Sequence, residues 1–227
     1  MAAVPPAPGA EVFMAGSWCQ QERAHHLPLL GLHEHRCVAD AGELAVGTNA
    51  SGAFVYANTG ISANINAVIS GAGALDKQGV GTVTLNAANT YTGGTTITDG
   101  TLGVGNNAAL STGTLTMSNS AILQAATSGL VIANDIIISP ATGARVDSGS
   151  GTFTLNGNIS GATGSLSQIG TGNLVLGGNN TFGAGLGINQ GRVTLMTNTA
   201  AGASDIALNN DAVLAAGVSG LVIGNDI

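Results

Sequence analysis

The sequence contains few charged residues, few aromatic residues and few prolines. Only 7% of its 227 residues are charged and 3% are aromatic, whereas globular proteins carry about 25% charged residues. Five Lys and Arg residues stand against twelve Asp and Glu residues, which excludes a basic nucleic-acid-binding surface. The 36 glycines keep no three-residue period and there are only five prolines, which excludes collagen. A hydrophobic content of 44% excludes a charged disordered chain.

Cysteine, histidine, tryptophan and glutamate are missing from residue 44 onward. Residues 1–43 hold both cysteines, all four histidines, the tryptophan and four of the five prolines. The only charged residues from 44 onward are seven aspartates and three basic residues: Lys77, Arg145 and Arg192. We therefore predict two regions, a non-repeat segment at 1–43 that we expect to be poorly ordered, and a second region at 44–227.

No signal peptide is visible at the N-terminus. Residues 1–16 contain no Lys or Arg, and Pro5, Pro6 and Pro8 interrupt any apolar run. No stretch reaches the ~18 consecutive apolar residues of a membrane-spanning helix. Taken literally, this pattern indicates a soluble cytoplasmic chain. The composition from residue 44 onward is instead typical of exported material, so we interpret 1–43 as a misassigned start or an unrelated junction.

The second region repeats itself with a shift of 91 residues and no gap. Residues 79–136 and 170–227 share 22 identities in 58 positions. We call the repeats that contain these segments, with the residues that adjoin them, copy 1 and copy 2. Self-similarity of this kind indicates a repeat architecture rather than a globular domain.

Within each copy, short segments alternate polar and apolar residues with a period of two, as half-buried strands do. Examples are residues 82–85, 95–98, 113–117 and 152–155. Gly, Asn, Asp and Ser bound each segment, and no window shows an apolar stripe at helical spacing. Such spacing suits an antiparallel sandwich as well as a parallel β-solenoid. A gapless repeat of 91 residues favours a solenoid of four or five coils per repeat, filled by stacked Val, Ile, Leu and Ala.

Residues 75–102 resemble the passenger-associated repeat of bacterial autotransporters, which runs roughly L-x-K-x-G-x-G-T-L-x-L-S-G-x-N-T-Y-x-G-x-T-x-I-x-x-G-T-L. The copy at 166–193 is weaker, because Gln168 stands where a basic residue is usual and Arg192-Val193 replaces Thr-Leu. The resemblance covers about 44–227. It implies an all-β fold, a right-handed parallel β-helix, at the cell surface or outside a Gram-negative bacterium.

The resemblance also implies a partner, the outer-membrane translocation barrel of the same full-length protein, and possible ligands on host or matrix surfaces. No sequence for such a barrel is present, so we expect a fragment truncated at its C-terminus. Its uncapped last coil, around Leu221 to Ile223, is expected to associate end to end or to aggregate.

Several motifs suggest sites that we do not expect to be functional. Residues 147–151, Asp-Ser-Gly-Ser-Gly, are similar to a serine-protease nucleophile loop, but every histidine lies in 1–43. Cys19, Cys37, His33 and His35 lack the usual spacing of zinc ligands, although a Cys19–Cys37 disulfide is possible. The Gly-x-Gly segments at 71–73, 103–105 and 183–187 precede no expected helix, so they are not phosphate loops.

Threonine pairs at 82/84, 96/98, 114/116 and 152/154 suggest an ice- or mineral-binding array, but their spacing is irregular. We therefore expect no catalytic, cofactor-binding or metal-binding residues and no cofactor. The predicted function is a non-catalytic passenger or stalk for display or adhesion. The alternative is a polysaccharide-active enzyme or another secreted carbohydrate-binding solenoid.

Overall fold

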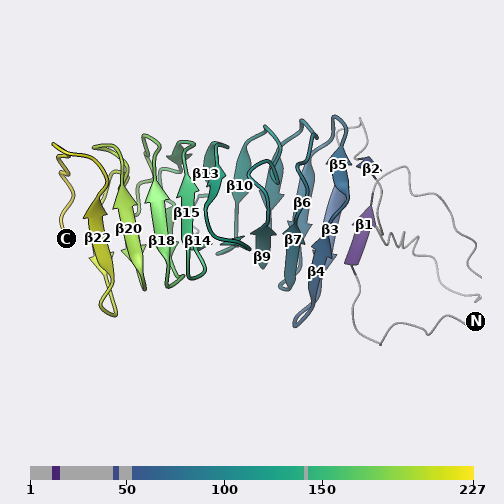
Figure 1. Cartoon of the computed structure of the whole chain (residues 1–227), viewed down its shortest axis with the longest axis horizontal. Helices are drawn as coiled ribbons and strands as arrows, with labels where there is room; N and C mark the ends of the chain where they lie inside the picture. Colours follow the sequence, from purple (N-terminus) through teal and green to yellow (C-terminus); the bar gives the residue numbers. More distant parts are fainter. Residues whose placement is uncertain (1–11, 16–42, 46–52, 141–142) are drawn as a thin grey trace, which may run out of the picture.

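A computed structural model describes residues 12–15, 43–45, 53–140 and 143–227. In these residues the chain forms short strands and no helix, and it winds into a parallel β-solenoid of about eight coils (Figure 1). Coils follow one another along the long axis in sequence order. The predicted all-β solenoid is therefore confirmed. None of the residues described forms a helix suited to crossing a membrane.

Three faces make up each coil, and the strands of each face stack in sequence order. Face 1 contains β1 (Val12–Ala15), β3 (Ala53–Ala57), β6 (Leu75–Gln78), β8 (Thr95–Ile97), β10 (Leu115–Met117), β13 (Ile136–Ile138) and β16 (Ile159–Ser160). Face 2 contains β4 (Ser62–Ile65), β7 (Thr82–Leu85), β9 (Thr101–Val104), β11 (Ile122–Ala125), β14 (Gly143–Asp147), β17 (Ser165–Gln168), β19 (Leu186–Ile188) and β21 (Ile206–Leu208). Face 3 begins with β2 (Glu43–Ala45) and β5 (Val68–Ser70) and continues with β12 (Leu130–Ile132), β15 (Thr152–Leu155), β18 (Asn173–Leu176), β20 (Arg192–Leu195) and β22 (Val213–Ala216).

In each copy, two successive coils have an irregular segment instead of a strand on one face. In copy 1 the gap on face 3 between β5 and β12 is filled by segments around residues 90 and 108. The Thr90 N–H donates to the Ile69 carbonyl at 2.8 Å, and the Asn89 N–H donates to the Ala108 carbonyl at 3.0 Å. In copy 2 the corresponding segments continue face 1 beyond β16, where the Thr181 N–H donates to the Ile159 carbonyl at 2.8 Å.

Strand pairing is parallel throughout the solenoid except at its first strand. From β3 onward the coils differ in length. On face 2, Thr82 pairs with Thr101, 19 residues later in the sequence. Farther along the same face, Ile122 pairs with Arg145, 23 residues later, so this coil is longer. β1 pairs antiparallel with β3, and β2 pairs in parallel with β5, both at the N-terminal end of the solenoid (Figure 1). Most of residues 1–43 lie outside the described residues, so the expectation of poor order there stays a prediction.

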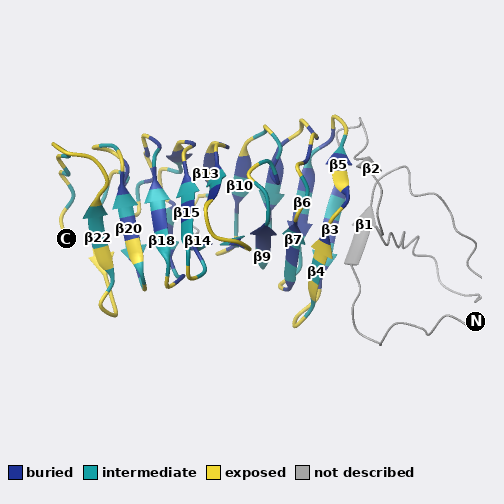
Figure 2. Cartoon of the chain, viewed as in Figure 1, coloured by how far each residue is buried: buried dark blue, intermediate teal, exposed yellow. Residues whose placement is uncertain are grey.

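The core is a continuous apolar column inside the solenoid (Figure 2). In most strands between β3 and β20 alternate residues point inward, and β7, β15 and β18 all show the same sequence of half-buried and buried positions. Val83 with its counterpart Leu174, and Ile97 with its counterpart Ile188, are fully buried. The predicted inward orientation of these equivalent residues is therefore confirmed.

The two copies do not occupy the same faces. β7 of copy 1 lies on face 2, and its counterpart β18 in copy 2 lies on face 3. On face 2, β17 stands four coils beyond β7, through β9, β11 and β14, and β18 is the next strand along the chain. A 91-residue shift therefore corresponds to four coils plus one face.

Candidate functional site

The side chain of Lys77 is buried inside the solenoid, beside Leu75 on the inner side of β6. Its ammonium donates to three backbone carbonyls, of Gln78 at 3.1 Å, Gly79 at 2.7 Å and Asp99 at 2.9 Å. The ammonium therefore joins the corner after β6 to the corner after β8 in the next coil. In the sequence Lys77 is one of three scattered basic residues, but its position two residues after Leu75 in an alternating strand is the signal that it points inward.

Burial lowers the pKa of Lys77 to about 8, while the charges of Asp99 and Asp76 act to raise it. Copy 2 has Gln168 at this position, also fully buried. The Gln168 amide donates to Ser148 Oγ at 2.5 Å and to the Gly170 carbonyl at 3.0 Å. Its Oε1 has no hydrogen-bond partner among the residues that the structure describes.

Two buried asparagines join three successive coils in the same way in both copies. The Ile69 N–H donates to Asn89 Oδ1 at 2.8 Å, and Asn89 Nδ2 donates to the Ala109 carbonyl at 2.6 Å. Asn180 makes the same pair of bonds, accepting at 2.8 Å and donating at 2.6 Å, one full repeat later. These side chains stabilise the scaffold and are not available to a ligand.

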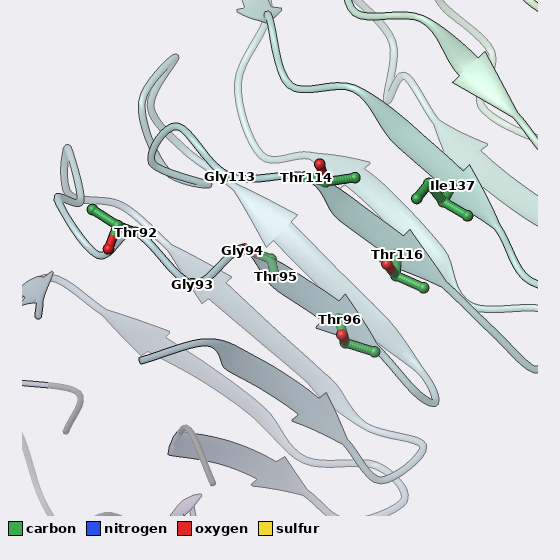
Figure 3. Close-up of a pocket in the computed structure, with 9 residues that line it drawn as sticks. All are labelled: Thr92, Gly93, Gly94, Thr95, Thr96, Gly113, Thr114, Thr116 and Ile137. Carbon is green, nitrogen blue, oxygen red and sulfur yellow. The ribbon is translucent and has the colours of Figure 1, made fainter. Parts of the chain in front are cut away.

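A shallow groove lies on face 1 of copy 1 (Figure 3). Its lining contains no charged side chain and consists of Thr92, Gly93, Gly94, Thr95, Thr96, Gly113, Thr114, Thr116 and Ile137. Thr96, Thr116 and Ile137 are register partners on β8, β10 and β13, and their side chains point outward in one row (Figure 3). The groove thus offers hydroxyl groups beside an exposed apolar side chain.

The corresponding surface of copy 2 has different chemistry and lies on face 2. Gly187 stands in place of Thr96, Ala207 in place of Thr116, and Asp205 in place of Thr114. The hydroxyl groups of the groove are therefore specific to copy 1.

The similarity of residues 147–151 to a protease loop has a structural explanation. Asp147 ends β14, and its Oδ1 accepts the Gly149 N–H at 2.8 Å, which forms a tight turn. Ser148 is 1% exposed and accepts the Gln168 amide. The Ser148 hydroxyl is therefore enclosed between two coils and does not face a cleft.

The other motifs give no assembled site in the part of the chain that the structure describes. Cys19, Cys37, His33 and His35 lie outside the described residues. No group of three or more His, Cys, Asp or Glu side chains that suits a metal ion occurs among the described residues. The segment at 103–105 overlaps the end of β9, and the threonine pairs fall on all three faces. Thr96 does lie beside Thr116, so one threonine neighbour pair forms on face 1.

Comparison with known proteins agrees with this structure. Residues 75–104 and 166–195 match the passenger-associated-transport-repeat family. These two segments run from β6 to the end of β9 and from β17 to the end of β20. They include Lys77 and its counterpart Gln168. The resemblance inferred from the sequence is therefore confirmed.

A segment of 125 residues, 54% of this chain, is 34% identical to the adhesin BmaC autotransporter of Brucella suis biovar 1 (strain 1330). The match spans only 3% of the length of that adhesin. No solved structure matches the chain. The described solenoid contains two segments that match the passenger-associated-transport-repeat family, four coils plus one face apart, and over 54% of its length the chain is similar to an autotransporter adhesin.

Proposed function

We propose that this region is a non-catalytic part of an autotransporter passenger that serves surface display or adhesion. The observation that carries the proposal is the use of the buried polar groups. Lys77, Asn89 and Asn180 each bond between successive coils, so the polar groups of the interior hold the stalk together. The name of the Brucella protein, an adhesin, agrees with this role.

The groove on face 1 supports a more specific role, binding of an uncharged saccharide. Thr96 and Thr116 place hydroxyl groups on adjacent strands, about 4.8 Å apart, and Ile137 adds an apolar contact 45% exposed to solvent. Neutral sugars present the same combination of hydroxyl groups and apolar C–H faces. A carbohydrate-binding solenoid is therefore the second candidate function.

The test is a screen of the 227-residue chain against neutral and acidic polysaccharides, with and without Ca²⁺, for both binding and release of reducing ends. We expect no release, and release would overturn the non-catalytic proposal. Binding that is lost in Thr96→Val and Thr116→Val but kept in Thr154→Val, on face 3, would support the saccharide role. Equal binding by all three variants would contradict a site at the groove.

We further propose a surface location and a barrel partner. The autotransporter relationship supports attachment to an outer-membrane translocation barrel of the full-length protein and display at the surface of a Gram-negative bacterium. Protease treatment of intact cells that express the full-length protein tests this. Epitopes in the solenoid should be cleaved or antibody-accessible without lysis, and protection until lysis would contradict the proposal.

Self-association of the 227-residue chain is also proposed. Its last coil exposes several large apolar side chains, and these are Leu208, Val213, Val218, Val222 and Ile227. β21 and β22 end their sheets, with no further strand beyond them in the described residues. Light scattering over a concentration series should show growth in mean mass. A constant monomer mass at high concentration would contradict this.

A further inference from the structure

The outer side of face 1 carries a continuous row of side chains that crosses five coils. Its members are register partners on β3, β6, β8, β10 and β13, namely Phe54, Asp76, Thr96, Thr116 and Ile137. All five are half-buried or exposed, and Figure 3 shows the part from Thr96 to Ile137. The next partner, Ser160, directs its hydroxyl to the Ile136 carbonyl at 3.4 Å. The row therefore has three polar side chains in its middle and an apolar side chain at each end.

The polar groups of this row are suited to an outside ligand. Asp76 Oδ1 accepts the Thr98 hydroxyl at 2.7 Å, and Asp76 Oδ2 accepts the Gln78 amide at 2.6 Å. These bonds fix the carboxylate, and each of its oxygens keeps a second lone pair for another donor. Within the described residues, no hydrogen bond uses the hydroxyl of Thr96 or Thr116. The middle of the row thus offers a fixed acceptor beside two unused hydroxyls.

Beside the row, the surface is hollowed at the corner that precedes β8 and β10. Gly93, Gly94 and Gly113 line this part of the groove without side chains, and the groove has a volume of about 380 Å³. This volume lies in the range of small-molecule sites. A ligand ring therefore has room to lie beside Thr96 and Thr116.

The charge on this face disfavours anionic ligands. On the described strands of face 1 from β3 to β16, Asp76 is the only charged side chain that points outward, because Lys77 is buried. The two arginines lie on other faces, Arg145 on β14 and Arg192 on β20. A ligand with carboxylates or sulfates would meet a negative charge here and no neighbouring cation.

The direction of the row determines how a ligand can lie on it. β8, β10 and β13 have three residues each, and only the middle one points outward. A ligand that runs along a strand would therefore meet one side chain of the row, whereas a ligand that runs along the solenoid axis would meet all five. Adjacent strands are about 4.8 Å apart, which is close to the length of one sugar unit in an extended glycan.

We propose that face 1 of copy 1 binds an extended neutral glycan along the solenoid axis, with one sugar per coil from Phe54 to Ile137. The two apolar ends contact the C–H faces of the outer sugars. The Asp76 carboxylate and the hydroxyls of Thr96 and Thr116 bond to hydroxyl groups of the sugars between them. This inference rests on the proposed saccharide role of the groove, and it adds the direction of the ligand, its length and the contribution of Asp76.

The corresponding row of copy 2 lacks these groups. On face 2, register partners stand at the positions of Asp76, Thr96 and Thr116, and these are Ser167, Gly187 and Ala207. The backbone arrangement is thus repeated without the carboxylate and without the threonine hydroxyls. Copy 2 is therefore expected not to bind the glycan, so changes in copy 1 alone should abolish binding by the whole chain.

Isothermal titration calorimetry of the 227-residue chain with cello-oligosaccharides of two to six sugars tests the direction. These probes are neutral, linear and extended. We expect the affinity to rise about fivefold with each added sugar, up to five sugars and not beyond. A plateau at two sugars, or no binding by any member of the series, would overturn the axial arrangement. Saccharide binding in the polysaccharide screen that depends on Thr96 and Thr116 would still support the saccharide role in that case.

Ile137→Ser locates one end of the site. It should remove the gain in affinity from the fourth to the fifth sugar and leave the gains of the shorter oligosaccharides in place. Val213→Ser is the matched control, because Val213 is 41% exposed on face 3 and Ile137 is 45% exposed. The control should keep the full dependence on length. An unchanged dependence in Ile137→Ser would overturn the assignment of this end.

Asp76→Asn tests the carboxylate. It should weaken binding of the five-sugar probe by about tenfold or more, because a charged acceptor is lost. Asp211→Asn, at an exposed corner before β22, is the control and should have no effect. Equal affinities in both variants would overturn the role of Asp76. Loss of self-association in Thr116→Val, in a chain that binds no oligosaccharide, would assign this face to a second copy of the chain and overturn the glycan site.

Discussion

The hydroxyl of Tyr91 lies 2.5 Å from Thr95 Oγ1 inside copy 1, and copy 2 has Phe182 and Leu186 at the two positions. All four side chains are buried. The second copy therefore lacks both partners of a buried hydrogen bond, not one of them. Losing both avoids leaving a buried polar group unpaired, which costs about 1–3 kcal/mol.

This relationship predicts a non-additive pair of substitutions. Tyr91→Phe and Thr95→Val should each lower the free energy of unfolding by about 1–2 kcal/mol, because each leaves one hydroxyl without its partner. The double variant should lose less than the sum of the two, with a coupling energy of about 1 kcal/mol. Urea denaturation of the four proteins measures this. Additive losses would show that the bond is energetically unimportant.

The buried Lys77 predicts an alkaline rise in stability. Its pKa is about 8 in the folded chain, against an ordinary value of 10.5 that we take for the unfolded chain. Between these values unfolding takes up a proton, so the free energy of unfolding increases with pH over that window. The rise is at most about 3 kcal/mol, and solvent screening at the corner reduces it. It is lost progressively as the pH falls from 10.5 to 8.

Lys77→Gln, which introduces the residue of copy 2, is the matched variant for this effect. It should remove the rise between pH 8 and 10.5, whatever it does to stability at neutral pH. Urea midpoints measured at closely spaced pH values give the slope. The same slope in both proteins would assign the titration to another group.

Substitution of Asn89 should be far more costly than substitution of Asn86, in the same corner of the chain. Asn89→Ala leaves the buried Ile69 N–H and Ala109 carbonyl without partners, and we expect a loss of about 3 kcal/mol. Asn86 is exposed and its side chain donates to Asn66, so Asn86→Ala should change stability by about 0.5 kcal/mol or less. Thermal and urea unfolding compare the two. Similar losses would mean that the bonds of Asn89 are not what joins the coils.

Substitutions at Gly100 and Gly129 distinguish two costs of adding a side chain at a left-handed position, namely backbone strain and overlap with a neighbouring coil. Both have positive φ, +70° and +83°. A Cβ at Gly129 meets nothing within 4 Å, so Gly129→Ala should cost only the backbone term of about 1–2 kcal/mol. A Cβ at Gly100 would overlap the Gly79 carbonyl oxygen of the preceding coil.

Gly100→Ala should therefore lower the free energy of unfolding clearly more than Gly129→Ala, by roughly 3 kcal/mol or more. Differential scanning calorimetry ranks the two variants. Equal melting temperatures would show that neighbouring coils can move apart at this corner.

The alternation of polar and apolar residues was enough to predict the strands and the inward residues, such as Val83 and Ile97. The 91-residue shift was enough to predict a solenoid. Neither pattern predicts how many faces a coil has. The coils differ in length at their corners, so the repeat length does not divide evenly into coils. The rotation between the copies was therefore not predictable.

The groove was missed for the same reason. Aligning the threonine pairs 96/98 and 114/116 in sequence would set Thr96 beside Thr114, whereas the strand register sets Thr96 beside Thr116. Lys77 was counted as a scattered basic residue because lysine side chains are seldom buried. Its three carbonyl partners come from two coils, and only the folded chain brings these together.

The offset of four coils plus one face also bears on how such a chain can change in length. β7 and its counterpart β18 have the same alternation of buried positions although they belong to different faces. A segment that fits one face therefore fits its neighbour. Gene duplications and deletions in this solenoid need not comprise whole coils, and a change of one strand with its corner is enough to keep the core continuous.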